Sequence, residues 1–279
     1  MLIKEIENFI EEDLGPDDIS CTLVPDRPSE AIVFTKEACT LAGLEEARAI
    51  FNYLGVRVKT EHREGEEVEA GATIFSLEGG AVSILRAERV ALNFLGHLCG
   101  IASLTRTCVK LVRKHSEHTR LACTRKTTPG IRKFEKKAVV AGGGDAHRFS
   151  LSDTIMIKDN HIQLLGIKAA IEAAKKASFT KKIEVEVESV KEAILAAGLG
   201  ADIIMLDNMD PEEIGNTLKS LEEKGLRKQV LIEASGGISQ ENLEAYAKTG
   251  VDVISMGALI HKARWIDLSL EISSFKVKA

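Results

Sequence analysis

The sequence lacks a long apolar run, paired cysteines and an excess of positive charge. Its 279 residues contain no signal-peptide pattern and no apolar stretch of about 18 residues, so we expect a soluble, cytoplasmic protein without a membrane partner. The five cysteines are odd in number and have no C-x-x-C spacing, which argues against a disulfide framework or a zinc site. The net charge of −5 argues against nucleic acid as a partner.

Positive charge is nevertheless concentrated in one segment, Thr124–His161. It contains Arg125, Lys126, His147, Arg148, Lys158 and His161. Two like charges about 4 Å apart repel by roughly 4 kcal/mol at an effective dielectric constant of about 20. If the fold gathers these cations at one end, an anion must lie among them. The alternative is that they form a solvated basic face.

The elements predicted around these cations favour a gathered cluster that holds an anion over a solvated basic face. Leu121–Thr124 and Thr154–Ile157 are typical of short apolar strands, and the segment from Pro129 to about Ala141 predicts a helix between them. Charged residues therefore follow directly after both strands. That placement is typical of the catalytic edge of an α/β barrel or a doubly wound sheet.

Residues 1–117 do not show a strand–helix repeat. Among their elements we expect a strand at Ala81–Leu85 and a long helix at Arg86–His115, broken near Gly100. Arg89 and Asn93 lie one turn apart on this helix, where surface or capping roles are usual.

From residue 119 onward, apolar strands alternate with helices. The strands are predicted to end near Thr124, Ile157, Val187, Leu206, Glu233 and Met256, and the helices to span Leu164–Ala177, Val190–Ala197, Pro211–Lys224 and Gln240–Thr249. This repeat predicts a parallel sheet, closed or nearly closed. Because there are too few strands for a complete barrel, we expect an incomplete or modified one.

Carboxylates and small residues are expected at the same edge. Ile183–Glu188 alternates strictly, which places its glutamates inside the barrel, unless it is an edge strand with a solvated face. Buried carboxylates require a cation or metal partner. Asp207 follows the next strand, and two carboxylates together can hold Mg²⁺.

Two loops of small residues end the last two units. Glu233–Ile238 and Ser255–Leu259 match the phosphate site that barrels build from late loops, although tight turns would also explain them.

Taken together, these motifs resemble one family. T-R-K-T-x-P-G, G-G-G-x-x-H-R, L-S-D-x-x-x-I-K-D-N-H, E-V-E-V-E, M-L-D-N, E-x-S-G-G-I and V-D-V-I-S-x-G-A-L occur in the order typical of quinolinate phosphoribosyltransferase, the nicotinate-nucleotide pyrophosphorylase (carboxylating). Upstream, Glu12–Gly15 and Glu88–Ala102 match too, so the resemblance covers nearly the whole chain. Asp145-Ala146 departs from the commoner Val-Asn, which puts a local contact in doubt.

The resemblance implies a fold and an assembly. It implies an N-terminal α/β sandwich domain at residues 1–117, followed by an incomplete TIM-like α/β barrel at 118–264 as the phosphoribosyltransferase domain. We expect the tail, residues 265–279, to pack back on the first domain. Family members form homodimers with an active site shared across the interface, and a larger assembly is left open.

The resemblance also implies a reaction. A pentosyltransferase of this family transfers the phosphoribosyl group of phosphoribosyl pyrophosphate to quinolinate with Mg²⁺ as cofactor. Loss of the 2-carboxyl group then gives nicotinate mononucleotide, pyrophosphate and CO₂, a step of de novo NAD biosynthesis. The pyridine nitrogen is the nucleophile, so the protein contributes positioning and charge stabilisation.

Individual residues receive roles from the same resemblance. Those implied for quinolinate are Arg89 (from the neighbouring subunit), Arg125, Lys126, His147 and Arg148. Those implied for phosphoribosyl pyrophosphate are Lys158, Glu186, Asp207, Ser235, Gly236, Gly237, Gly257 and Ala258. Lys126, Lys158, Glu186 and Asp207 are implied as catalytic, and Glu186 and Asp207 as Mg²⁺ ligands.

Other functions share this architecture. A nicotinate phosphoribosyltransferase that does not decarboxylate, or a molybdenum-associated relative, is one alternative, but Arg125, His147 and Arg148 suit a dicarboxylate better than a monocarboxylate. A non-catalytic nucleotide or phosphate sensor is the other. It would need the phosphate loops without Lys158, Glu186 and Asp207.

Overall fold

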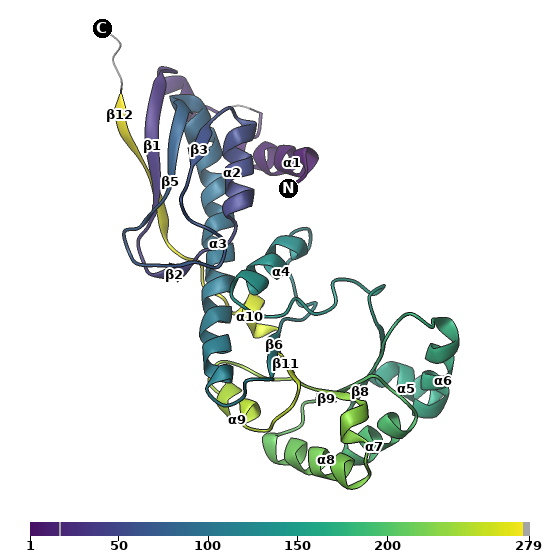
Figure 1. The fold of residues 1–279 in the computed structure, drawn as a ribbon. Helices are drawn as coiled ribbons and strands as arrows, with labels where there is room; N and C mark the ends of the chain where they lie inside the picture. The colour runs from purple at the N-terminus through teal and green to yellow at the C-terminus, as the bar shows by residue number, and fades with distance from the viewer. Residues whose placement is uncertain (17, 276–279) are drawn as a thin grey trace. The chain divides into compact units, whose positions relative to one another are not determined.

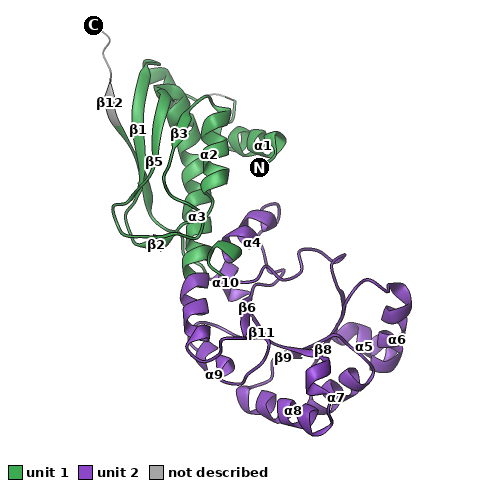
Figure 2. Cartoon of the chain, in the orientation of Figure 1, with its two compact units in different colours: residues 1–104, 140–143, 263–279 green, residues 105–139, 144–262 purple. Residues whose placement is uncertain are grey.

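The computed structural model describes residues 1–16 and 18–275, which fold as two compact units (Figure 2). Unit 1 comprises residues 1–104, 140–143 and the C-terminal segment from 263, and unit 2 comprises 105–139 and 144–262. The division falls inside helix α3 (Ala81–Arg113). The domain boundary expected after residue 117 stays a prediction.

Unit 1 is built on an antiparallel sheet with the order β12-β1-β5-β3 (Figure 1). Its strands are β1 (Pro28–Thr35), β3 (Arg57–Lys59), β5 (Thr73–Gly80) and β12 (Leu268–Phe275), and a separate pair joins β2 (Cys39–Thr40) to β4 (Glu67–Val68). Its helices are α1 (Ile3–Leu14), η1 (Ser20–Leu23), α2 (Leu44–Tyr53) and the first part of α3 (Ala81–Arg113). The predicted N-terminal α/β domain is confirmed, with the C-terminal strand as part of its sheet.

An apolar core holds unit 1 together. Burial alternates along β1, so that Ala31 and Val33 face inward, and they share one cluster with residues of α2, β5 and α3. Within this cluster the rings of Phe51 and Phe75 meet edge to face, with centroids 6.5 Å apart. Such packing is typical of a folded core.

Two expectations about α3 are wrong. Residues 81–85 are its first turns and not a strand, because burial recurs at Ala81, Ile84 and Ala87 with a helical period. The helix also runs through Gly100 without a break. A Cβ at Gly100 would lie 2.0 Å from the carbonyl oxygen of Arg264, so this glycine admits the crossing C-terminal segment.

Unit 2 contains a six-stranded parallel sheet with the order β6-β11-β10-β9-β8-β7. The strands are β6 (Arg120–Ala122), β7 (Ile155–Ile157), β8 (Ile183–Val187), β9 (Ile203–Asp207), β10 (Leu231–Ser235) and β11 (Val253–Ser255). The helices are α4 (Arg132–Ala141), α5 (Asp159–Leu165), α6 (Ile167–Ala177), α7 (Val190–Gly198), α8 (Pro211–Glu223), η2 (Arg227–Gln229), α9 (Leu243–Ala247) and α10 (Ala258–His261). Gly166, with φ of 75°, separates α5 from α6 where one helix was predicted.

The sheet of unit 2 curves without closing. β6 and β7 are its two edges, and α6 and α7 pack against β7, β8 and β9 (Figure 1). Residue 145 adds a parallel bridge to Ala122 at the β6 edge, and the chain then crosses to β7. The predicted incomplete barrel is confirmed, and residues 145–154 connect its open edges.

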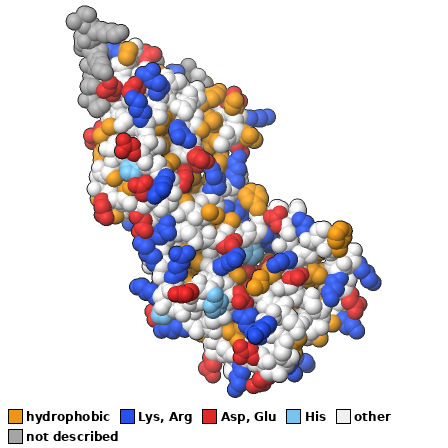
Figure 3. All heavy atoms as spheres, viewed as in Figure 1, with side chains coloured by type: hydrophobic (Ala, Val, Ile, Leu, Met, Phe, Trp, Pro, Cys, Tyr) orange, Lys and Arg blue, Asp and Glu red, His pale blue; other side chains and the backbone are white. Residues whose placement is uncertain are grey.

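The surface carries charges of both signs. On the face drawn in Figure 3, acidic and basic side chains are interspersed. Within the described part of the chain, no helix combines the length and the apolarity that crossing a membrane requires.

Candidate active site

The strand ends of unit 2 bring the predicted residues to one edge of the sheet. Carboxyl ends of parallel strands meet at the same edge. Asp207 ends β9, and it pairs in register with Ser235, which ends β10. Lys158 follows β7 and Gly257 follows β11 by two residues.

The loop after β6 holds the first two cations. The backbone N–H of Lys126 donates to Thr124 Oγ1 at 3.0 Å, and the carbonyl of Arg125 accepts from the backbone N–H of Thr127, also at 3.0 Å. Arg132 ties this loop to the segment before β7 through Thr127 Oγ1 (2.9 Å) and the carbonyl of Phe149 (3.1 Å). The Nε of Arg125 is buried and has no hydrogen-bond partner among the described residues. A buried donor of this kind suits an anionic ligand.

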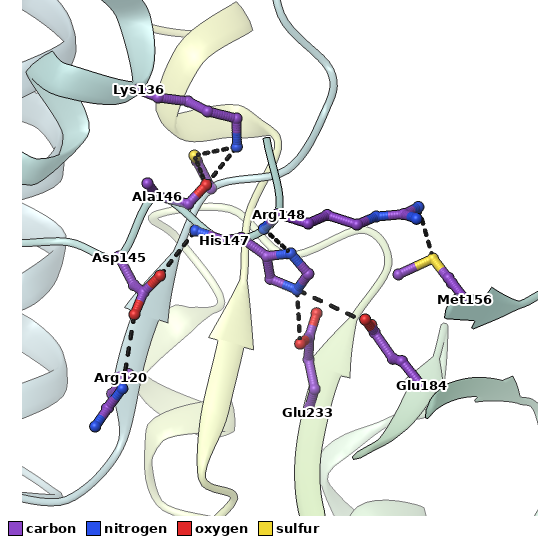
Figure 4. A network of polar contacts seen from close by, with 10 residues as sticks. Arg120, Lys136, Asp145, Ala146, His147, Arg148, Met156, Glu184 and Glu233 are labelled. Carbon is purple, nitrogen blue, oxygen red and sulfur yellow. Dashed lines mark hydrogen bonds and ion pairs between the residues drawn. The ribbon is translucent and has the colours of Figure 1, made fainter. Parts of the chain in front are cut away.

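His147 and Arg148 lie on the segment that crosses between the sheet edges (Figure 4). The backbone N–H of His147 donates to Asp145 Oδ1 at 2.7 Å, and Lys136 Nζ donates to the carbonyl of Ala146. The guanidinium of Arg148 reaches the sulfur of Met156 on β7, 2.8 Å from Nη2. Thus both residues of the departure Asp145-Ala146 hold this segment in place: Asp145 through its side chain, which accepts from His147, and Ala146 through its carbonyl, which accepts from Lys136.

The imidazole of His147 points into the sheet toward two buried glutamates. Its Nε2 lies 3.0 Å from Glu233 Oε2 on β10 and 3.9 Å from Glu184 Oε1 on β8. The side chains of Glu184 and Glu233 are 1% and 2% exposed. Burial lowers the pKa of His147, but the hydrogen bond and charge of Glu233, together with the charge of Glu184, outweigh it, so the pKa is raised overall.

Glu184 is held in an unfavourable environment for a carboxylate. Burial, followed by the charge of Glu233, raises its pKa to about 7. Neither of its oxygens has a hydrogen-bond partner in the described structure. The strict alternation of β8 predicted an inward-facing glutamate here, but sequence reasoning assigned no role to Glu184 or to Glu233, which was grouped with a phosphate loop.

Lys158, Glu186 and Asp207 form a second cluster. Lys158 Nζ lies 2.5 Å from Glu186 Oε2. The pKa of Asp207 is raised overall. Burial and the charge of Glu186 raise it by more than the nearby charges of Lys158 and Lys126 lower it. Two carboxylates that repel each other and offer oxygen atoms match the ligand preference of Mg²⁺.

The small-residue loops lie beside this cluster. Gly236 has φ of 92°, and a Cβ there would lie 2.3 Å from Asn208 Oδ1, so only glycine fits against the loop after β9. Gly237, next in that loop, also has a positive φ of 60°. At Gly257 a Cβ would contact Lys126 Cδ at 3.0 Å and His261 Nε2 at 3.3 Å, which places His261, a residue the sequence reasoning missed, next to the loop. Ala258 begins the short helix α10.

Arg89 is the exception among the predicted site residues. It belongs to unit 1, where its side chain is exposed on α3, whereas all the others belong to unit 2.

Comparisons with known proteins agree across the whole chain. The family model described as quinolinate phosphoribosyl transferase, N-terminal domain, matches residues 18–99, and that of the C-terminal domain matches 101–271. A "probable nicotinate-nucleotide pyrophosphorylase (carboxylating)" of Methanothermobacter thermautotrophicus is 46% identical over 275 residues, covering 97% of this chain and 99% of the relative. The human nicotinate-nucleotide pyrophosphorylase (carboxylating) is 38% identical, covering 98% and 92%. The structure of the nicotinate-nucleotide pyrophosphorylase from Francisella tularensis superposes with a TM-score of 0.91 at 38% identity, covering 97% and 95%.

Proposed function

Because the chain belongs to the quinolinate phosphoribosyltransferase family, we propose that the strand-end edge of unit 2 is where it converts quinolinate. The function of the chain is that of a nicotinate-nucleotide pyrophosphorylase (carboxylating), a pentosyltransferase of NAD biosynthesis. What the proposal adds is the assignment of residues to the two substrates.

The buried guanidinium nitrogen of Arg125 carries this assignment. It has no partner in the described structure, and the contact made by Arg148 is to a neutral sulfur. Quinolinate is a dianion, and arginine forks bind carboxylates through two parallel hydrogen bonds. We assign Arg125 and Arg148 to its two carboxylates, with Lys126 beside them. The resemblance implied that His147 also binds quinolinate; because its ring nitrogens are engaged by Glu233 and by the backbone of Arg148, we assign it instead to the support of Arg148.

Phosphoribosyl pyrophosphate is assigned to the second cluster. Lys158 would contact its pyrophosphate, and the loops containing Ser235, Gly236, Gly237, Gly257 and Ala258 would hold its 5-phosphate through backbone N–H groups. Glu186 and Asp207 are the residues that would hold Mg²⁺, and the ion would supply positive charge that neutralises the pyrophosphate. The pKa of Asp207 is raised first by burial and then by the charge of Glu186, and this supports the assignment, because a nearby cation would stabilise the charged carboxylate.

The reaction then needs no protein nucleophile. The pyridine nitrogen of quinolinate forms a bond to C1 of the ribose as the bond from C1 to the pyrophosphate oxygen breaks. Glu186 and Asp207 face the positive charge that develops on the sugar. The C2–carboxylate bond then breaks, CO₂ leaves, and its electron pair remains beside the cationic ring nitrogen until C2 takes up a proton.

We further propose a cytoplasmic homodimer, or a larger assembly of dimers, in which Arg89 completes the quinolinate site of the neighbouring subunit. The exposure of Arg89 on α3 supports this role. All five cysteines are free, as is usual where thiols stay reduced.

A labelled-substrate assay tests the proposed function. Purified protein with Mg²⁺, phosphoribosyl pyrophosphate and quinolinate labelled in its 2-carboxyl group should release labelled CO₂ and nicotinate mononucleotide in equal amounts. Nucleotide formed from nicotinate, without CO₂ from quinolinate, would instead identify a non-decarboxylating enzyme.

A further inference from the structure

We propose that Glu233 is a positioning residue for quinolinate binding: it orients the imidazole of His147 so that this ring fixes the backbone of Arg148. The inference rests on the proposed function, in which Arg148 binds a carboxylate of quinolinate. It gives a role to a buried carboxylate to which the substrate assignment gives none and which lies outside the proposed Mg²⁺ ligands.

The backbone at His147 needs such support. Its φ is 52°, in the left-handed region that side chains other than glycine rarely adopt. Three hydrogen bonds surround this residue: from its own N–H to Asp145 Oδ1 (2.7 Å), between Nε2 and Glu233 Oε2 (3.0 Å), and from the Arg148 N–H to Nδ1 (2.7 Å). Strained backbone of this kind persists where its surroundings determine it, often at ligand sites.

These bonds determine the tautomer of the ring. Since the N–H of Arg148 donates to Nδ1, that nitrogen carries no proton, and Nε2 therefore carries one and donates it to Glu233. The two carboxylates favour a second proton on the ring, but it would have to sit on Nδ1, against another N–H. The hydrogen bond from Arg148 therefore opposes the protonation that the raised pKa of His147 favours, and in this geometry the imidazole is neutral.

The same tautomer argues against a metal site, which is the obvious alternative. His147, Glu184 and Glu233 offer ligand atoms within 4.8 Å of one another, the spacing of a metal site. A metal on Nε2 would need the lone pair of that nitrogen and would move the proton to Nδ1. The bond from Arg148 would then be lost. The cluster is thus arranged to hold a ring in place.

Glu233 and Glu184 differ in one respect that makes a matched control. Both are buried to within 2% exposure, yet only Glu233 lies within hydrogen-bond distance of His147, whereas Glu184 Oε1 is 3.9 Å from Nε2. If the glutamates acted on His147 only through their charge, both would be needed. If the hydrogen bond to the ring is what matters, only Glu233 is needed.

The test measures KM for each substrate in three variants. Glu233→Leu keeps a similar volume but removes the acceptor, and should raise KM for quinolinate about tenfold or more while KM for phosphoribosyl pyrophosphate changes less than about threefold. Glu233→Gln keeps an acceptor oxygen and should restore most of the quinolinate affinity. Glu184→Gln should leave both KM values within about threefold of wild type.

Nitrogen-15 NMR of the histidine rings supplies a readout that does not depend on activity or on the stability of Glu233→Leu. In the wild-type protein at neutral pH, the two ring nitrogens of His147 should have widely separated shifts, as in a neutral imidazole. Similar shifts for both would indicate an imidazolium and overturn the inference.

Three kinetic outcomes would also overturn it: an unchanged quinolinate KM in Glu233→Leu, a Gln variant as impaired as the Leu variant, or an equal effect of Glu184→Gln. Arg148→Ala separates this failure from failure of the proposed function. If Arg148→Ala raises KM for quinolinate and Glu233→Leu does not, only the positioning role is wrong. If Arg148→Ala has no effect either, the assignment of the quinolinate site is wrong.

Discussion

The two units bury different kinds of side chain. Unit 1 encloses a continuous apolar cluster, and Glu46 is its one buried charged residue in the described chain. Unit 2 buries Glu135, Lys136, Glu184 and Glu233 within a unit of comparable size. Buried charges cost stability unless they are compensated. The contrast indicates that unit 1 is organised for apolar packing, while unit 2 also buries charged side chains, among them the two glutamates beside His147.

The largest expected effect is that of Asp207→Asn in unit 2, which should lower activity without lowering stability. Asp207→Asn keeps the shape of the side chain but removes a charge from the proposed Mg²⁺ site, so kcat/KM should decrease by roughly a hundredfold or more. Because burial and Glu186 disfavour that charge, the free energy of unfolding without Mg²⁺ should stay level or rise slightly. Steady-state kinetics and denaturant unfolding measure the two. A variant that loses stability and keeps its activity would remove Asp207 from the site.

The next effect concerns the pH dependence of unfolding. The pKa of Glu184 is raised from 4.5 to about 7 in the folded protein, so between these values the folded state binds more protons than the unfolded state. Stability should therefore decrease as pH rises through this window, by roughly 1–3 kcal/mol without Mg²⁺. Glu184→Gln should abolish this part of the dependence. Parallel curves for variant and wild type would show that Glu184 titrates normally.

The smallest effects compare one helical glycine from each unit. Gly100→Ala places a Cβ against the carbonyl of Arg264 in unit 1 and should destabilise the protein by about 1–3 kcal/mol. Gly215 lies in α8 of unit 2 with nothing within 4 Å of a Cβ, so Gly215→Ala should stabilise by about 0.5–1 kcal/mol. Thermal unfolding measures both. Equal changes in the two variants would mean that close packing at Gly100 is not what requires glycine.

Sequence reasoning captured the features that depend on local periodicity. The alternation of β8 placed Glu184 and Glu186 on the inner face, and the strand–helix repeat gave the parallel sheet and its open edges. The strand predicted at 81–85 was wrong because a short apolar run fits a buried helix as well as a strand.

The features that could not be predicted from the sequence depend on contacts between segments that are distant in the chain. Glu233 was grouped with the glycines that follow it, and its bond to His147, far away in the chain, is formed only by the fold. Gly100 was interpreted as a break in the helix because glycine weakens helices. The contact that actually requires glycine there is with Arg264, near the other end of the chain, and local sequence does not reveal it. Lys158 and Glu186 were predicted to lie at the same edge of the sheet, but only the structure shows that they form a direct ion pair.

The most direct test of the assignment of substrates is the pair of KM values for Arg148→Ala. If the loop between the sheet edges binds quinolinate and the Lys158 cluster binds phosphoribosyl pyrophosphate, KM for quinolinate should rise by roughly a hundredfold, as expected for the loss of a charged hydrogen-bonding group. KM for phosphoribosyl pyrophosphate should change less than about threefold. An equal rise in both, or a rise confined to phosphoribosyl pyrophosphate, would contradict the account.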